Sequence, residues 1–238
     1  MELWYRKLGF YSNPFSIKPG AFHDEVIGHE LNGLLEKIEN GKIQYVKADY
    51  GNGKTTILKH IIRRFGGKKM VAFTSCNIAD NFDTKKLLMG RALINKAFSI
   101  MPKNMILLVD EAQDITLEEA ADILENYNGG SLKSVVFFGA EIKPKNLPKE
   151  LSNYLSGNII TLSRLSPEKA VEVIRKRIGE IHIISDSLIR KLYLISSNNP
   201  RKLLENCEDL CRHAASKNRS SATEADLREL FGRKPVKK

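Results

Sequence analysis

The stretch Ala-Asp-Tyr-Gly-Asn-Gly-Lys-Thr, residues 48–55, constrains the fold of this chain more than any other feature. It follows a short apolar segment, residues 42–48, that predicts a β-strand, and it leads into residues 55–67, whose spacing predicts a helix ended by two glycines. Gly51 and Gly53 let the backbone curl so that successive N–H groups point towards the oxygens of a phosphate at the helix N-terminus. Strand, Gly-rich turn and helix in this order predict a phosphate-binding loop, with Ala in place of its usual first Gly.

The residue types around this turn suit a nucleoside triphosphate. Lys54 is expected to neutralise charge on the β- and γ-phosphates, and Thr55 to place its hydroxyl on Mg²⁺. The predicted nucleotide contacts in the turn are Asp49, Tyr50, Gly51, Asn52, Gly53, Lys54, Thr55 and Thr56.

A second stretch, residues 105–114 (MILLVDEAQD), supports the same interpretation. Four apolar residues predict a buried strand, and Asp110 at its end is placed to hold Mg²⁺ through water. The neighbouring Glu111 is then placed to orient and deprotonate a water that attacks the γ-phosphate. An apolar strand that ends in surface acids is common by itself, but after a phosphate loop it predicts a catalytic centre.

The order of elements predicts two domains. Between residues 1 and 163, strand patterns alternate with helical ones, which is typical of a parallel sheet covered on both faces. From residue 164 to 238 only amphipathic helices are evident, with a short basic tail at 232–238. We therefore expect an α/β nucleotide-binding domain with an N-terminal arm (1–163) and a small helical lid (164–238).

Charge and cysteine content limit the partners and the compartment. The chain of 238 residues carries 38 basic and 28 acidic residues, a net charge of +10, which favours an anionic partner such as nucleic acid without requiring one. Three cysteines argue against a disulfide framework and for a reducing compartment. The apolar runs are too short to span a bilayer, and the start lacks the pattern of a secretory signal. We expect a cytoplasmic protein with no membrane segment.

Together these stretches resemble the AAA+ ATPases, P-loop proteins with an αβα domain of five parallel strands followed by a helical lid. Residues 25–38 are similar to the segment before the phosphate loop in initiator-type members, and the resemblance places Val26 and Ile27 against adenine; His29 stands where Arg is usual. The Asn-Pro-Phe near the start and the Asp-Glu-Ala-Gln of the second stretch are similar to transposition-helper and secretion-pathway members. The resemblance implies ATP and Mg²⁺ as cofactors.

The segment 198–210 (NNPRKLLENCEDL) resembles the sensor 2 motif of the same family. Asn199 is suited to cap a helix and Pro200 to be its first residue, so that Arg201 projects from the start of a lid helix. The resemblance implies that Arg201 reaches the γ-phosphate; the alternative is a solvated helix arginine.

Two departures from the family pattern predict slow turnover. The sensor 1 position, at the end of the strand near residue 138, holds Gly139-Ala140-Glu141 instead of a polar residue, so either Glu141 substitutes or the contact is missing. Residues 149–157, which usually carry the arginine finger, hold only Lys149, and Arg164 lies just beyond the next strand. An arginine finger is worth several orders of magnitude in rate, so we expect a slow ATPase, or one completed by a partner or a second copy.

The resemblance implies coupling of ATP to DNA, in replication initiation, helicase loading, recombination or transposition, through a non-specific basic surface. The alternative is a nucleotide-gated switch that recruits a protein partner without DNA. Secretion-pathway or cell-wall work is a third possibility, but it would need a membrane span or wall-binding module.

Other sequence features have structural explanations that we favour over functional ones. Cys207 and Cys211 share a helix face near His213, and a buried pair is favoured over a metal site; Cys76 is expected in the core. The Lys-rich loop 143–150 is expected to be solvated, although it could touch phosphates. Packing of the arm explains the aromatic residues at the start better than base stacking; these are Trp4, Tyr5, Phe10, Tyr11 and Phe15.

Overall fold

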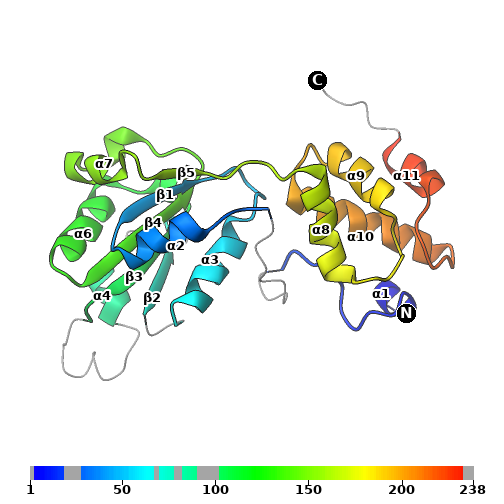
Figure 1. The fold of residues 1–238 in the computed structure, drawn as a ribbon, viewed down its shortest axis with the longest axis horizontal. Helices are drawn as coiled ribbons and strands as arrows, with labels where there is room; N and C mark the ends of the chain where they lie inside the picture. The colour runs from blue at the N-terminus through cyan, green and yellow to red at the C-terminus, as the bar shows by residue number, and fades with distance from the viewer. Residues whose placement is uncertain (1–2, 19–27, 67–69, 78–81, 90–101, 233–238) are drawn as a thin grey trace. The chain divides into compact units, whose positions relative to one another are not determined.

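The computed structural model describes residues 3–18, 28–66, 70–77, 82–89 and 102–232, which form two compact units (Figure 1). The sheet unit consists of residues 29–50 and 54–163, and the helical unit is built mainly from residues 1–28 and 164–238. Each unit has its own cluster of buried apolar residues. None of the described helices is both long and apolar enough to cross a membrane.

Five parallel strands form the sheet in the order β2-β3-β4-β1-β5. The strands are β1 (Ile43–Lys47), β2 (Val71–Ser75), β3 (Met105–Asp110), β4 (Leu132–Gly139) and β5 (Ile159–Thr161). The helices of this unit are α2 (Asn32–Glu39), α3 (Lys54–Arg64), α4 (Thr84–Met89), α6 (Leu117–Asn128) and α7 (Lys149–Leu155), with short 3₁₀ turns η2 (Ala112–Asp114) and η3 (Pro144–Asn146). The five-stranded parallel sheet with helices confirms the expected αβα fold.

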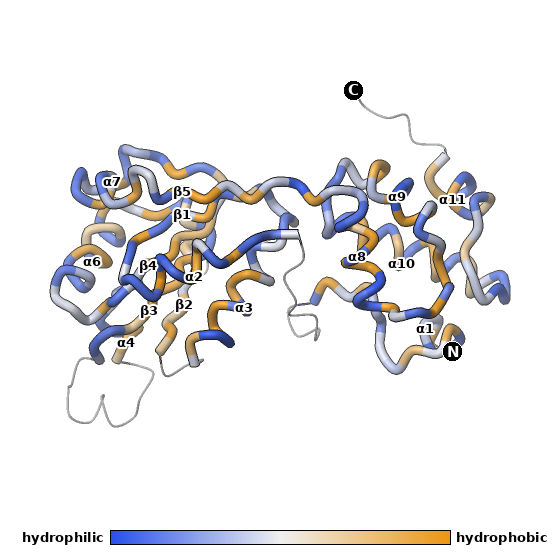
Figure 2. Tube along the Cα trace, viewed as in Figure 1, coloured by the Kyte–Doolittle hydropathy of each residue, from blue (hydrophilic) through white to orange (hydrophobic). Residues whose placement is uncertain are grey.

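Both faces of the central strands are buried, which explains why these strands read as continuous apolar runs. Every residue of β3 except Asp110 is buried, and Figure 2 shows the apolar colour concentrated along the central strands. Tyr45 and its same-face neighbours pack with side chains of α6 and α7. On the opposite face, the side chain of Gln44 donates a hydrogen bond to the Leu34 carbonyl of α2 (3.2 Å).

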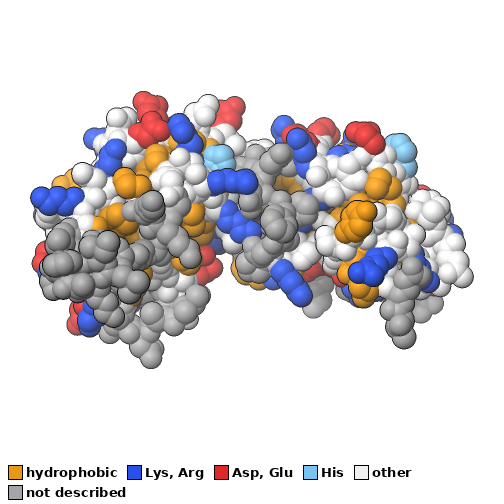
Figure 3. All heavy atoms as spheres, turned by 90° about the horizontal axis from the view of Figure 1, so that it is seen from below, with side chains coloured by type: hydrophobic (Ala, Val, Ile, Leu, Met, Phe, Trp, Pro, Cys, Tyr) orange, Lys and Arg blue, Asp and Glu red, His pale blue; other side chains and the backbone are white. Residues whose placement is uncertain are grey.

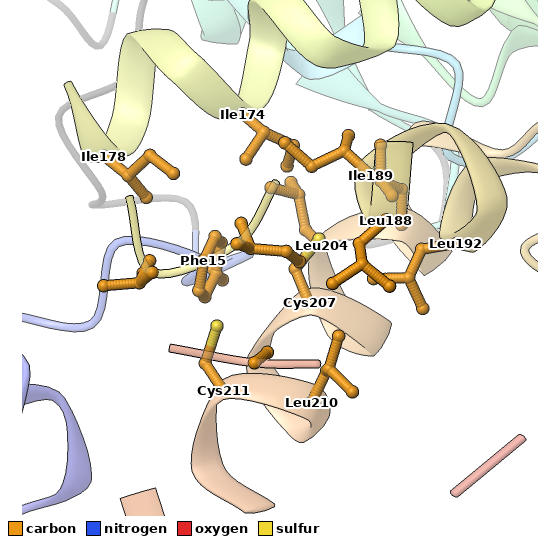
Figure 4. Close-up of a cluster of buried hydrophobic side chains, with 14 of the residues drawn as sticks. Phe15, Ile174, Ile178, Leu188, Ile189, Leu192, Leu204, Cys207, Leu210 and Cys211 are labelled. Atoms are coloured by element: carbon orange, nitrogen blue, oxygen red, sulfur yellow. The ribbon is translucent and has the colours of Figure 1, made fainter. Parts of the chain in front are cut away.

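The helical unit contains α1 (Trp4–Lys7), α8 (Pro167–Ile178), α9 (Asp186–Ile195), α10 (Pro200–Ser216) and α11 (Glu224–Phe231). Its core is one apolar cluster to which α8, α9 and α10 all contribute (Figure 4). The N-terminal Phe15 lies in this cluster, fully buried, with the ring of Trp4 stacked on it at a centroid distance of 6.3 Å.

The position of the arm differs from the expectation that grouped it with the α/β domain. Arg177 of α8 donates hydrogen bonds to the carbonyls of Pro14 (3.3 Å) and Ser16 (3.1 Å), which ties the arm to the helical unit. Packing of the arm thus explains Trp4 and Phe15, whereas Tyr11 is 99% exposed. The arm lacks periodicity, so nothing local in its sequence indicated which core it joins.

Candidate nucleotide site

The loop between β1 and α3 has the backbone that its glycines predict. Gly51 and Gly53 have φ angles of 86° and 92°, in the left-handed region that strongly favours glycine. Asn52 between them is buried, whereas Asp49 and Tyr50 are exposed. A Cβ added at Gly53 would meet no heavy atom of the described residues within 4 Å. The loop leads directly into an eleven-residue helix, whose first N–H groups have no intrahelical acceptor and favour anions.

Lys54, the first residue of α3, folds back over this loop. Its ammonium group donates a hydrogen bond to the Ala48 carbonyl at 3.0 Å, and the residue is only 8% exposed. A buried ammonium group at a glycine loop before a helix N-terminus suits an anionic ligand. The next residue, Thr55, is exposed and Thr56 is half-buried, so the Thr55 hydroxyl is accessible to a ligand.

Asp110 and Glu111 lie at the carboxyl edge of the sheet. The pKa of Asp110 is raised because the carboxyl group is buried and because Glu111 adds negative charge; a hydrogen bond from the Glu111 N–H (3.0 Å) and the charge of Lys54 act in the opposite direction. Glu111 has φ 51°, an uncommon left-handed conformation for a residue other than Gly. Because parallel strands end at one edge, Lys54 and these two acids share the same edge of the sheet. The donor set of Lys54, Thr55 and Asp110 therefore fits a Mg²⁺–triphosphate.

The end of β4, where a polar residue was expected, is occupied by a different side chain. Glu141 is exposed and pairs with Lys47 at 3.3 Å, an ion pair at the surface. The side chain of Gln113 instead meets this edge: its amide oxygen accepts a hydrogen bond from the Ala140 N–H (3.2 Å), and its amide nitrogen donates to Glu111 Oε2 (2.7 Å). Sequence reasoning did not assign a role to Gln113; the signal was an amide two residues after Glu111 together with Gly139 at the end of a buried strand.

Arg201 is the second residue of α10, and the start of this helix is built as predicted. The Asn199 side chain accepts a hydrogen bond from the Lys202 N–H at 3.1 Å, and Pro200 is the first helical residue. Arg201 forms an ion pair with Glu205 one turn later, at 3.4 Å. Its contact with a γ-phosphate stays a prediction, and so do the adenine contacts, because Val26 and Ile27 lie outside the described residues.

The cysteines are structural. Cys207 and Cys211 are buried in the core of the helical unit, and burial raises the pKa of the Cys211 thiol to about 12. Near them, His213, Asp226 and Glu229 bring one ligand atom each within 4.8 Å of one another. However, Lys217 bonds Glu229 and Arg219 bonds Asp226, so these carboxylates already have cationic partners.

The chain is similar to known proteins in structure but not in sequence. No protein-family model matches the sequence, and no curated protein does. The structure of Cdc6p from Pyrobaculum aerophilum is similar at a TM-score of 0.68 with 12% identity, over 91% of this chain and 69% of that chain. The Aeropyrum pernix ORC1 protein, solved in complex with DNA, gives a TM-score of 0.68 with 12% identity, over 89% and 67%. A K64R mutant of Thermotoga maritima RuvB gives 0.65 with 15% identity, over 87% and 69%.

TM-scores of 0.65 and 0.68 over most of the chain show a shared fold, which is the one that the sequence motifs indicated. The matching features are the five-stranded parallel sheet, the glycine loop after β1, the paired acids after β3 and the helices that follow residue 164. The chain has the fold of the AAA+ P-loop ATPases.

Proposed function

We propose that this protein binds ATP with Mg²⁺ and hydrolyses it, and that its nucleotide state is coupled to DNA. The observation that carries the proposal is the buried Lys54 ammonium group, held at 3.0 Å from the Ala48 carbonyl at the sheet edge where Asp110 and Glu111 also lie. A lysine, a Thr hydroxyl and two acids at the carboxyl edge of a parallel sheet form a donor set for phosphoryl transfer.

In the proposed reaction Glu111 acts as the general base. Its carboxylate takes a proton from water as the water oxygen forms a bond to the γ-phosphorus. The bond from that phosphorus to the β–γ bridging oxygen breaks, and ADP keeps the electron pair. Lys54 stabilises the negative charge that develops on the phosphate oxygens. Mg²⁺, held by Thr55 and through water by Asp110, would supply further charge neutralisation at the same oxygens.

Other residues complete the proposed site. Val26 and Ile27 contact the adenine, and Asp49, Tyr50 and Asn52 belong to the loop around the phosphates. Arg201 senses the γ-phosphate from the start of α10. This assignment follows the AAA+ resemblance, and the exact start of α10, with its Asn199 cap, supports it by fixing where Arg201 leaves the helix.

Coupling to DNA rests on basic surface. Lys143, Lys145 and Lys149 are all exposed around η3, and within the described residues none of the three has an ion-pair partner. On the face drawn in Figure 3, basic side chains are interspersed with acidic ones instead of forming one continuous patch. Unpaired lysines on a loop suit phosphate contacts that carry no sequence information. We propose weak, salt-sensitive and sequence-independent DNA binding, in a reducing compartment consistent with three free cysteines.

A nucleotide-gated switch is the second candidate, favoured by the composition of α7. This helix, Lys149–Leu155, holds no arginine, and Lys149 is its only cation. Without an arginine that approaches a neighbouring site, intrinsic hydrolysis is slow. A second copy or a protein partner would then supply the missing charge, with Arg164 as the other candidate in this chain.

The test is ATP turnover by the purified protein with duplex and single-stranded DNA at two salt concentrations. Glu111→Gln should keep ATP binding and lose roughly 100-fold or more in turnover, the scale of general-base catalysis. DNA should raise wild-type turnover, and less so at high salt. ATP binding with negligible turnover and no response to DNA would establish the switch, and absence of ATP binding would refute both candidates.

A further inference from the structure

Gly139, the last residue of β4, is glycine because no room is left for a side chain, and not because its backbone conformation requires glycine. It does not have a positive φ, so other residues could adopt its backbone. A Cβ built on it would collide first with the Tyr45 hydroxyl, and would lie 2.6 Å from the side-chain amide oxygen of Gln113 and 3.1 Å from its backbone nitrogen. The side chains of Gln113 and Tyr45 therefore fill the volume that a side chain at the end of β4 would need.

The hydrogen bonds of Gln113 link two parts of the site. Its amide oxygen accepts from the Ala140 N–H at the end of β4, and its amide nitrogen donates to Glu111 Oε2 at 2.7 Å and to Asp114 Oδ2 at 3.1 Å. The amide orientation is fixed by this pattern, since the oxygen faces a donor and the nitrogen faces two acceptors. Within the described residues the other oxygen of Glu111, Oε1, accepts no hydrogen bond.

We propose that Gln113 is a positioning residue for Glu111: it ties one carboxylate oxygen to the end of β4 and leaves the other oxygen available to take the proton of the attacking water. In this chain the amide from η2 thus replaces a polar side chain on β4. The role of Glu141 follows from the same geometry, since its bond to Lys47 keeps it at the surface. This inference rests on the proposed ATPase function.

The strain at Glu111 supports this role. A left-handed backbone at a residue other than Gly persists where the surrounding structure holds it, and φ is 51° at Glu111. A hydrogen bond between an amide and a carboxylate is charge-assisted and therefore strong, and it stiffens the side chain on which catalysis depends. Glu111 cannot be held in this way by the end of β4 or the residue after it, because Gly139 has no side chain and the Ala140 side chain has no polar atom.

Single-turnover ATP hydrolysis with enzyme in excess tests the inference, because it reads slow rates. Gln113→Ala should lower the hydrolysis rate roughly 10- to 100-fold, the worth of a hydrogen bond to a charged group, with unchanged ATP affinity and melting temperature. Gln113→Glu keeps the size of the side chain but loses the N–H donor, and should lower the hydrolysis rate at least as much. Gly139→Ala should also lower the rate, because its Cβ would displace the Gln113 amide oxygen together with the Tyr45 hydroxyl. The control is Asn128→Ala, which removes an exposed amide-to-carboxylate bond to Glu150 in the same unit and should leave the rate unchanged.

A double variant tests whether Gln113 acts through Glu111 or only supports the local structure. In a Glu111→Gln background, Gln113→Ala should have no further effect on hydrolysis, because its target is already gone. If Gln113→Ala keeps a wild-type rate while Glu111→Gln is inactive, the inference is wrong and the proposed function stands. If the wild type neither binds nor hydrolyses ATP, the proposed function is wrong and the inference falls with it.

Discussion

The two units differ in how they treat their polar groups. In the described part of the helical unit, a side chain caps each of the four helices after residue 164; the caps are Ser166, Ser185, Asn199 and Thr223. At the carboxyl edge of the sheet, by contrast, Glu111 has a left-handed backbone, burial raises the pKa of Asp110, and the buried Tyr45 hydroxyl has no hydrogen-bond partner among the described residues. The difference therefore lies in the capped helix starts and in the buried carboxyl group beside the unpartnered Tyr45 hydroxyl. Left-handed backbone alone does not separate the units, because Ser197, Asn198 and Asn218 of the helical unit share it with Glu111.

The largest effect on stability is expected in the helical core. Phe15→Ala should lower the free energy of unfolding by about 3–5 kcal/mol, because it leaves a cavity beneath Trp4 in a fully buried cluster. Tyr11→Ala is the matched control, since its ring is almost fully exposed and should cost less than about 0.5 kcal/mol. Urea denaturation measures both. Equal losses would mean that the arm does not belong to this core.

The next effect is expected on binding instead of stability. Lys54→Ala should weaken the binding of a non-hydrolysable ATP analogue with Mg²⁺ roughly 10- to 100-fold, because it removes a hydrogen bond between charged groups. Its effect on unfolding should stay well below that of Phe15→Ala. Titration calorimetry gives the affinity. If the analogue binds Lys54→Ala as tightly as the wild type, the loop does not hold the phosphates.

What could be predicted from the sequence follows the same division. Local chemistry specified the glycine loop, the acids after β3 and the Asn199-Pro200 helix start, because each depends on neighbouring residues only. The placement of Phe15 and the role of Gln113 depend on contacts with distant segments, the helical core and the end of β4. The sequence shows a glycine at position 139 where the family pattern has a polar residue, but only the volume occupied by Gln113 and Tyr45 explains why glycine is there.

Removing one helix cap in each unit should lower stability by a smaller amount, and by the same amount in both units. Thr116 and Thr223 both form capping boxes, with Glu119 and Asp226 as their third helical residues. Thr116→Ala and Thr223→Ala should each cost about 1 kcal/mol. Thermal unfolding monitored by circular dichroism compares them. A much larger loss for Thr223→Ala would show that the ion pair between Arg219 and Asp226 depends on the cap.

The last prediction is a substitution that raises stability at neutral pH, whereas those above lower stability or binding. The folded-state pKa of Asp110 is raised, mainly by burial, so the native state binds a proton more readily than the unfolded chain does. Stability should therefore fall as pH rises through the window between the ordinary carboxyl pKa and the raised one, and above that window the ionised Asp110 destabilises the protein without nucleotide. Asp110→Asn removes that charge, and its amide oxygen can still accept from the Glu111 N–H. This variant should melt at a higher temperature than the wild type at pH 7, converge with it at acid pH, and lose Mg²⁺-dependent hydrolysis. A lower melting temperature at pH 7 would mean that Lys54 compensates the buried charge fully, and the carboxyl edge would then be no less satisfied than the helical unit.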